Sequence, residues 1–404
     1  MCKTICPVCG GGQTDTLLSL SNIPVFVNVL PDQLEEAKEF VLGTQHLAQC
    51  NHCGFVFNCE FEPEKVMYDT GYHAERGHSA YYSRHISRVI DFIESVKPVK
   101  GQRLLEVACG GGEFLAEAAK RGPKDVTGVD PSAPETAAEP LNLQKALFDD
   151  AYLEKMTCPA DILMNRHMIE HILNPLEMLA RFRRALAPTG ILYLETPRLD
   201  WILENRAFFD FPYEHCAYYH DAFIERLLKA AGFEIAAMEN SYDGQYFSIC
   251  ARKSTPQPAL TPASEAELCA VRQAFSKLER TYTEINRAQA VPGFCAETRR
   301  SGKPDLHSDS THPDGVFFWG AAAKGVMCAN LLNQWPIAGF IDKNVHKQGK
   351  FIPGTGHPVL APEQITYELV KTVIVENDVY LTEIQAEAGK IDPRIVVLSL
   401  SSLL

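Results

Sequence analysis

Several features that mark other classes of protein are missing from this sequence. No run of residues approaches the roughly 18–20 consecutive apolar side chains that a membrane-spanning helix needs, so we expect no membrane partner. The first residues, Met-Cys-Lys-Thr-Ile-Cys, have neither the apolar segment nor the cleavage pattern of a secretion signal. Lys and Arg number 38 against 51 Asp and Glu, and the net charge of −13 disfavours a nucleic-acid-binding surface. We therefore expect a cytoplasmic protein with small-molecule ligands in local sites.

Short apolar runs that alternate with amphipathic segments dominate the chain from residue 103 onward. The 404 residues, 46% of them hydrophobic, have the composition of a folded globular protein and the length for two or three domains. The alternation predicts a doubly wound parallel α/β sheet that ends near Lys253, then a proline-rich linker, an amphipathic helix and a second α/β run. The predicted strands are 104–107, 126–129, 162–164 and 191–194 in the first run, and 316–319, 337–341, 371–375 and 394–398 in the second.

Four of the thirteen cysteines form two pairs of identical spacing. The pairs are Cys6-Pro-Val-Cys9-Gly and Cys50-Asn-His-Cys53-Gly, with a predicted strand at 23–30 between them. Four thiolates from two such turns match the closed tetrahedral coordination of structural zinc, and they leave no open position for catalysis. Unmetallated turns, a redox pair and His52 as a replacement ligand are the alternatives.

A glycine-rich turn, Glu106-Val-Ala-Cys-Gly-Gly-Gly-Glu-Phe114, follows the first strand and opens a helix. Glycines at such a turn let the backbone approach a ligand closely, and Asp130 ends the next strand, where a carboxylate can accept hydrogen bonds from ribose hydroxyls. Glu106 would repel the pyrophosphate of a nicotinamide cofactor but suits the ammonium of S-adenosylmethionine, which we therefore predict as the cofactor. A tight turn without a ligand is the alternative. The predicted cofactor-binding residues are Glu106, Ala108, Cys109, Gly110, Gly112, Phe114, Asp130, Pro131, Asn165 and His167.

Two further segments carry titratable groups. Asn165 to His171 follows the fourth strand, where residues face the cofactor crevice, although helix capping or core packing would also explain His167 or His171. The loop around Glu214-His215 is dense in aromatic and titratable side chains. Histidine is the side chain best matched to taking a proton near pH 7, and Glu214 could orient it. An aromatic packing loop is the alternative.

The second α/β run has its own small-residue turn, Gly320-Ala-Ala-Ala-Lys324-Gly325. A strand, such a turn, a lysine and a helix start can together hold a phosphate-sized anion through backbone N–H groups and one ammonium. The spacing differs from a Walker motif, because no Ser or Thr follows Lys324. A purely structural turn is the alternative.

In this order and combination, the motifs resemble the nucleotide-sugar C-methyltransferases of deoxysugar pathways. The likeness covers nearly the whole chain, and it is carried by the two cysteine pairs and by 106–112, 166–171 before Asn174-Pro175, Glu214-His215, 320–325 and 342–355. The resemblance implies a small zinc-binding domain at 1–70 and a Rossmann-like class I S-adenosylmethionine methyltransferase domain at 71–253. It also implies a linker helix with a C-terminal Rossmann-like α/β substrate-binding domain at 254–404.

The resemblance also implies a reaction, the transfer of a methyl group to a sugar carbon beside a ketone. His215 would be the general base that removes the α-proton, Glu214 would support it, and Tyr72 and Tyr213 would line the site. The C-terminal domain would grip the nucleotide diphosphate of the substrate, in a monomer or homodimer. The implied substrate-binding residues are Lys324, Gly320, Ala321, Asn344 and Tyr68.

Three departures from the family's pattern lie near the expected substrate. Pro212 replaces a tyrosine, Gly244-Gln-Tyr-Phe replaces a Gly-Gly-Ser pattern, and Glu376-Asn377 replaces a Trp-Asn pair. They leave the sugar and the acceptor atom open. The alternatives are an O- or N-methyltransferase of a natural product, a nicotinamide-dependent reductase, and a non-catalytic zinc-containing protein that binds a nucleotide sugar.

Overall fold

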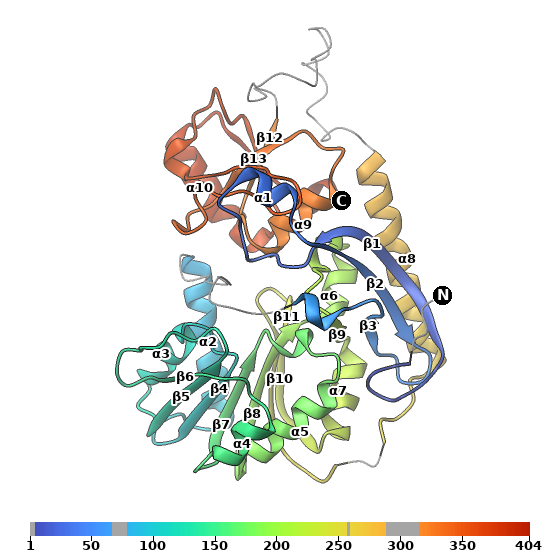
Figure 1. Cartoon of the computed structure of the whole chain (residues 1–404), viewed down its shortest axis with the longest axis vertical. Coiled ribbons are helices and arrows are strands. Elements are labelled where there is room, and N and C mark those ends of the chain that lie inside the picture. Colours follow the sequence, from blue (N-terminus) through green and yellow to red (C-terminus); the bar gives the residue numbers. More distant parts are fainter. Residues whose placement is uncertain (1–4, 67–78, 257–258, 288–314) are drawn as a thin grey trace. The chain divides into compact units, whose positions relative to one another are not determined.

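The computed structural model describes residues 5–66, 79–256, 259–287 and 315–404 (Figure 1). Within these residues, no helix combines the length and the apolar character needed to cross a membrane. The chain divides into two compact units, each drawn from separate segments. Unit 1 comprises 1–19, 46–202 and 215–273, and unit 2 comprises 20–45, 203–214 and 274–404. The three domain ranges expected from the sequence stay predictions.

Unit 1 is built on a seven-stranded sheet in the described part of the chain, with the strand order β10-β11-β8-β7-β4-β5-β6. The strands from β8 to β6 pair in parallel, whereas β11 pairs antiparallel with both β8 and β10. The Rossmann-like α/β fold is therefore as predicted, and the four predicted strands pair in parallel. The antiparallel hairpin of β10 and β11 was not predicted. The strands are β4 (Arg103–Val107), β5 (Asp125–Asp130), β6 (Asn142–Lys145), β7 (Ala160–Arg166), β8 (Leu186–Pro197), β10 (Phe233–Ser241) and β11 (Tyr246–Lys253).

Helices cover both faces of this sheet, which explains why its central strands are mostly apolar and lack a polar face (Figure 1). Alternate residues along β4 and β7 enter different cores: Leu105 and Leu163 pack with α5 and α7, whereas Leu104 and Ile162 pack with α2 and α3. The helices of unit 1 are α2 (Ala80–Val96), α3 (Glu113–Ala119), α4 (Asp150–Lys155), α5 (Pro175–Ala185) and α7 (Asp221–Ala230), with α6 (Leu199–Glu204) and α8 (Glu265–Arg287) ending in unit 2.

The chain order of this sheet predicts where a ligand binds. From β4 the chain moves outward to β5 and β6, then returns to β7 on the other side of β4. Ligands of open α/β sheets bind in the crevice beyond the carboxyl ends of the two strands at which the order reverses. In unit 1 these strands are β4 and β7.

A smaller sheet carries the cysteine pairs and has the order β1-β2-β3-β9 in the described residues. Its strands are β1 (Thr14–Pro24), β2 (Leu42–Cys50), β3 (Val56–Asn58) and β9 (Ala217–Tyr218). The strand expected at 23–30 is wrong, because β1 ends at Pro24. Val25, Val27 and Leu30 in the following segment are buried, but the backbone N–H of Val27 donates to the side chain of Glu214 instead of to a neighbouring strand.

Unit 2 contains a parallel sheet of five strands, within the residues described, in the order β14-β13-β12-β15-β16. Its order reverses between β12 and β15, so the second predicted ligand crevice lies at the carboxyl ends of those strands. The strands are β12 (Val316–Trp319), β13 (Ile337–Ile341), β14 (Val359–Leu360), β15 (Thr372–Val375) and β16 (Val396–Ser399). The helices are α1 (Leu34–Lys38), α9 (Ala323–Leu331) and α10 (Leu381–Ile391). Short 3₁₀ helices of the chain are η1 (Pro63–Lys65), η2 (Ile169–His171), η3 (Phe208–Asp210), η5 (Pro362–Gln364), η6 (Asp378–Tyr380) and η7 (Ser401–Leu403).

Replacing either of two helical glycines of unit 2 by alanine should have opposite effects on stability. A Cβ on Gly325 in α9 would lie 2.0 Å from the carbonyl oxygen of Gly320, whereas a Cβ on the exposed Gly389 in α10 would meet nothing within 4 Å. We expect Gly325→Ala to lower the free energy of unfolding by about 1–3 kcal/mol through overpacking. Gly389→Ala should raise it by about 0.5–1 kcal/mol, because alanine favours the helix. Urea unfolding followed by circular dichroism measures both, and equal stability of the two variants would contradict the prediction.

Candidate functional site

The two cysteine pairs bring four sulfur atoms together. Sγ of Cys6 lies 3.7 Å from Sγ of Cys53, and Sγ of Cys9 lies 3.5 Å from Sγ of Cys50. All four sulfurs are within 4.8 Å of one another, and three of the four cysteines are buried. This arrangement could hold one tetrahedral metal ion.

The backbone of each pair explains its closing glycine. Gly10 N–H donates to the carbonyl of Cys6 and Gly54 N–H donates to the carbonyl of Cys50, both over 2.9 Å. The φ angles of the two glycines are +73° and +80°, a region that other residues enter only at a cost. The repeated spacing in the sequence therefore produces two turns of the same geometry.

The second cysteine turn is connected to the loop that carries His215 through the pairing of two short strands. Strand β3 follows Cys53 and pairs with β9, where Val56 lies opposite Tyr218 and Phe57 opposite Ala217. The N–H of Asn58 also donates to the carbonyl of Cys216 over 2.9 Å. The position of His215 is thus tied to the cysteine cluster through a short antiparallel pairing.

The glycine-rich turn after β4 is held to the end of β5. Ala108 N–H donates to the carbonyl of Val129 over 2.8 Å, and Gly110 N–H donates to Oδ2 of Asp130 over 2.9 Å. Gly112, with φ +82°, caps the start of α3, and Ala108 has φ +62° although it is not glycine. The turn thus has the strand–turn–helix geometry that the sequence predicts.

Each of the neighbouring strands β4 and β7 has a buried acceptor atom near its carboxyl end. Oε2 of Glu106 and Oδ1 of Asn165 have no hydrogen-bond partner among the described residues. Burial raises the pKa of Glu106 to about 8, although the charge of Arg166 acts in the opposite direction. Buried polar atoms are normally paired, so each of these oxygens lacks a donor that a ligand could supply. The ammonium of S-adenosylmethionine fits them.

The other predicted cofactor residues surround this point. Oδ1 of Asp130 accepts hydrogen bonds from the N–H and hydroxyl of Ser132, so that Pro131 lies in a tight turn. The guanidinium of Arg166 lies 4.4 Å above the ring of Phe114, and burial raises the pKa of the Cys109 thiol. The carboxyl ends of β4, β5 and β7 therefore gather the predicted set at one edge of the sheet.

A buried carboxylate that sequence reasoning missed connects this edge to α2. Glu195 in β8 is fully buried; it accepts two hydrogen bonds from Arg166, at 2.9 and 3.1 Å, and one from the hydroxyl of Tyr193. Nε2 of His85 and Nε2 of His167 lie 3.0 and 2.9 Å from its oxygens. Burial alone would raise its pKa, but Arg166 and the two imidazoles hold the pKa well below the usual range. The only sequence signal was its place at the end of a predicted strand.

His215 lies in a second cluster, with His171 and Glu170. Their ligand-type atoms are within 4.8 Å of one another, and the two imidazole centroids are 4.8 Å apart. Burial by itself would raise the pKa of Glu170, but the imidazoles of His167, His215 and His171 hold it at about 2. An ionised carboxylate therefore lies beside the predicted base, and the three groups could alternatively hold a metal ion.

The loop that bears His215 packs on η2, which carries Glu170 and His171. The hydroxyl of Tyr219 donates to the carbonyl of Ile169 over 2.8 Å, and the thiol of Cys216 donates to the carbonyl of Glu170 over 3.7 Å. These bonds connect segments about 50 residues apart in sequence. Sequence spacing alone could not indicate that Glu170 neighbours His215.

Of four other predicted residues, the structure describes two. Oε1 of Glu214 accepts a hydrogen bond from the N–H of Val27 over 2.7 Å, so this carboxylate anchors a loop of unit 2. Tyr213 is fully buried, with its ring against Gly43. Tyr68 and Tyr72 lie outside the described residues. The functional roles of all four stay predictions.

The predicted anion-binding turn of unit 2 repeats the design of the turn in unit 1. Ala321 N–H donates to Oδ2 of Asp342 over 2.8 Å, and Gly320 has φ +136°. Nζ of Lys324 forms an ion pair with Asp210. Nδ2 of the buried Asn344 has no hydrogen-bond partner in the part of the chain described. Gly320, Ala321, Lys324 and Asn344 thus follow the carboxyl ends of β12 and β13, but Lys324 is already paired with a carboxylate.

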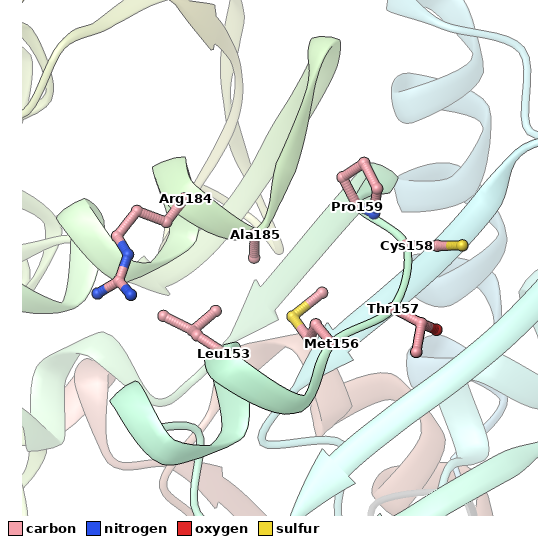
Figure 2. Close-up of a pocket in the computed structure, with 7 residues that line it drawn as sticks. All are labelled: Leu153, Met156, Thr157, Cys158, Pro159, Arg184 and Ala185. Carbon is pink, nitrogen blue, oxygen red and sulfur yellow. The ribbon is translucent and has the colours of Figure 1, made fainter.

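A surface pocket lies at the opposite edge of the sheet of unit 1 (Figure 2). Its lining includes Thr157, Cys158 and Pro159 before β7 and Ala185 before β8, which places it at the amino ends of these strands. Figure 2 also shows Met156 and Arg184 at its rim. The pocket is therefore separate from the crevice at the carboxyl ends.

Comparisons with known proteins match the two α/β regions separately. Residues 76–237 match a family model described as a methyltransferase domain, and residues 294–391 match a C-methyltransferase C-terminal domain. The C-methyltransferase NovU of Streptomyces niveus is 25% identical over 89% of this chain and 86% of its own length. A ubiquinone biosynthesis O-methyltransferase of Rhodopseudomonas palustris (strain TIE-1) is 31% identical, but over only 27% of this chain and 45% of its own length.

Solved structures similar to the chain include two methyltransferases. The magnesium protoporphyrin IX methyltransferase from Synechocystis PCC 6803 with bound SAH is 16% identical, with a TM-score of 0.34 over 43% of this chain and 84% of its own. An S-adenosylmethionine-dependent methyltransferase from Mesorhizobium loti is 14% identical, with a TM-score of 0.32 over 43% of this chain and all of its own.

The two domain matches agree with the chemistry of the site. The methyltransferase model covers β4, β5 and β7 with their unpartnered acceptor oxygens, and the C-methyltransferase model covers the turn of unit 2. The chain is therefore an enzyme, an S-adenosylmethionine-dependent C-methyltransferase.

Proposed function

We propose that this enzyme methylates a carbon atom next to the ketone of a nucleotide-activated sugar, with His215 as the general base. The observation that carries the proposal is the ionised, buried Glu170 beside the imidazoles of His215 and His171. Removal of a proton from carbon needs a base whose protonated form is stabilised, and a neighbouring carboxylate does this for an imidazole. Transfer to oxygen or nitrogen would not require such a base for a carbon-bound proton. The NovU match over most of the chain also supports transfer to carbon.

In the proposed reaction, His215 takes the α-proton, and the electron pair of the broken C–H bond moves toward the ketone oxygen. The imidazolium that forms lies near Glu170, which offsets its charge, while Glu214 holds the loop through Val27. Bound S-adenosylmethionine supplies an electrophilic methyl group to the carbon that has lost its proton. Glu106, Asn165 and Asp130 would hold this cofactor, with the turn at 108–112 approaching it through its backbone.

We further propose that the four cysteines bind one structural zinc ion. Four sulfur ligands and no open position are the arrangement of structural zinc, not of catalytic zinc. In this proposal the ion takes no part in the chemical step. It stabilises the position of β3, which follows Cys53 and pairs with β9, the strand after His215. The turn of unit 2 would bind the diphosphate of the substrate.

The base assignment predicts the effect of His215→Asn. We expect turnover to fall about 10²–10⁴-fold, because general base catalysis contributes a factor of that size. Keto-sugars linked to UDP, dTDP and GDP would be screened with S-adenosylmethionine, and methyl transfer and exchange of the α-proton with D₂O would be followed by NMR. Both rates should fall together, while cofactor affinity stays the same. His46→Asn, at a half-buried imidazole of the same unit, is the control, and unchanged turnover of the His215 variant would remove it from the mechanism.

The Glu106 assignment predicts how cofactor affinity depends on pH. The carboxyl group, with a pKa of about 8 in the free protein, must lose its proton to pair with the ammonium. Affinity for S-adenosylmethionine should therefore rise between pH 5.5 and 7.5, by up to about tenfold per pH unit. Calorimetry measures this below the range in which a free α-amino group titrates, about pH 7.7–8.0. Glu106→Gln should abolish the dependence and Glu117→Gln, on the outer face of α3, should keep it; a flat wild-type profile would refute the assignment.

The zinc proposal predicts about one zinc ion per chain by mass spectrometry. Cys9→Ser should lose the metal and become less stable, by about 4 kcal/mol when free zinc exceeds its dissociation constant a thousandfold. Methyl transfer should fall with it, since the pairing that holds the His215 loop depends on the cluster. Cys158→Ser, at an exposed cysteine, is the control and should match the wild type in metal content and thermal unfolding. Metal-free protein of full stability would contradict the proposal.

A further inference from the structure

The ligand crevice of unit 2 contains an acidic residue that none of the preceding assignments uses. Glu376 directly follows β15, on one side of the central strand β12, and Asn344 follows β13 on the other side. The turn that begins at Gly320 leaves β12 between them. All three segments meet at the carboxyl edge of the sheet, where the strand order reverses.

The side chain of Glu376 lies against the turn itself. Its Oε1 is 2.5 Å from the position that a Cβ on Gly320 would occupy, so the glycine leaves the space for this carboxyl group. Its Oε2 is shielded from solvent and has no hydrogen-bond partner within the described ranges. The residue as a whole is only half-buried, but this oxygen is not solvated.

Asn344 provides a second, independent sign of a ligand. The residue is 3% exposed; its Oδ1 accepts a hydrogen bond from the N–H of His346 over 2.9 Å. Its Nδ2 is buried and donates to no atom that the structure describes. Because buried amide groups are nearly always paired, an acceptor atom belongs beside this nitrogen. Phosphate oxygens are such acceptors.

The charged groups around Glu376 decide whether its ionised or its neutral side chain can lie beside a bound anion. From α9 it faces Lys324 and the thiol of Cys328, and from the end of β13 and the following loop it faces Asp342 and Lys347. Lys324 is paired with Asp210 from η3, and Nζ of Lys347 donates to the carbonyl of Ala321 over 3.0 Å. With Glu376 ionised, three carboxylates would oppose two ammonium groups. A neutral Glu376 leaves the charges balanced, and the start of α9 then favours an anion.

We propose that Glu376 binds the substrate as a neutral carboxylic acid and donates a hydrogen bond to an oxygen of its diphosphate at the turn 320–324. The carboxyl group of Glu376 must then carry its proton for the nucleotide sugar to bind. This inference rests on the proposed function, because it takes a diphosphate as the ligand of unit 2. Burial agrees with it, since it raises the pKa of Glu376 to about 8, with the charges of Lys324 and Lys347 opposing the shift and that of Asp342 adding to it. At pH 7 the acid form therefore predominates.

Calorimetry on the full chain with UDP-glucose, dTDP-glucose and GDP-glucose tests the inference at pH 7, 8 and 9. The diphosphate diester of these probes keeps the same charge across this range. For the probe that binds best, wild-type affinity should fall about tenfold from pH 7 to pH 9, because only the protonated protein binds. At pH 8, titrations in two buffers of different ionisation heat should show an uptake of about half a proton.

Glu376→Gln keeps a hydrogen-bond donor and removes the titration, so its affinity should be independent of pH, with no proton uptake. Glu363→Gln, an exposed acid on η5, is the matched control and should keep the wild-type slope. Thermal unfolding establishes that each variant is folded. A wild-type affinity that is flat or rises with pH, or a Gln variant with the wild-type slope, would overturn the inference and leave the proposed function standing. If no probe binds the wild type at any pH, the proposed nucleotide-sugar function is itself wrong.

Discussion

The antiparallel pairing of β3 with β9 is the contact on which the position of His215 depends. One strand begins three residues after Cys53 and the other begins two residues after His215. Two paired positions of β3 and β9 hold the loop, together with one hydrogen bond from the N–H of Asn58 to the carbonyl of Cys216. A strand of two residues has no stability of its own, so its partner must be fixed by something else. That partner, β3, pairs with β2 on its other edge and follows the second cysteine turn, so the proposed metal site would hold the His215 loop through this sheet.

Three buried glutamates of unit 1 show how partners decide the ionisation state of similar groups. Glu195 has an arginine and two imidazoles close by, and Glu170 has three imidazoles, so the pKa of each is lowered in spite of burial. For Glu106, burial together with the charges of Glu195 and Asp130 outweighs the charge of Arg166, and its pKa is raised. A buried carboxyl group that has no paired cation within the folded chain can pair with the cationic group of a ligand. The difference agrees with the proposal that Glu106 pairs with the cofactor, whereas Glu195 and Glu170 already have cationic partners within the chain.

The sequence predicted the local part of this site and missed the part that depends on tertiary contacts. A strand, a glycine turn and a following helix are neighbours in the chain, so the geometry of 106–114 could be inferred from residue types. The same holds for the cysteine turns, whose glycines adopt positive φ angles as the spacing indicates. By contrast, His85 and Glu195 are 110 residues apart, and only the folded sheet brings them together. The strand predicted at 23–30 is wrong for a related reason. The segment 25–30 is partly buried, as a strand would be, but the N–H of Val27 donates to the side chain of Glu214.

The two proposed ligand sites share one design and differ in the sign of the charge proposed for their ligands. In each, a backbone N–H of the turn donates to an aspartate at the end of the next strand, Asp130 in one and Asp342 in the other. In each, a glutamate beside the turn keeps an oxygen without a hydrogen-bond partner in the described chain, and burial raises its pKa to about 8. The unpartnered neighbour differs: an acceptor oxygen of Asn165 faces the first crevice edge, whereas a donor nitrogen of Asn344 belongs to the second. If both proposals hold, binding the two substrates releases one proton and retains another, so the same buried chemistry serves a cationic donor and an anionic acceptor.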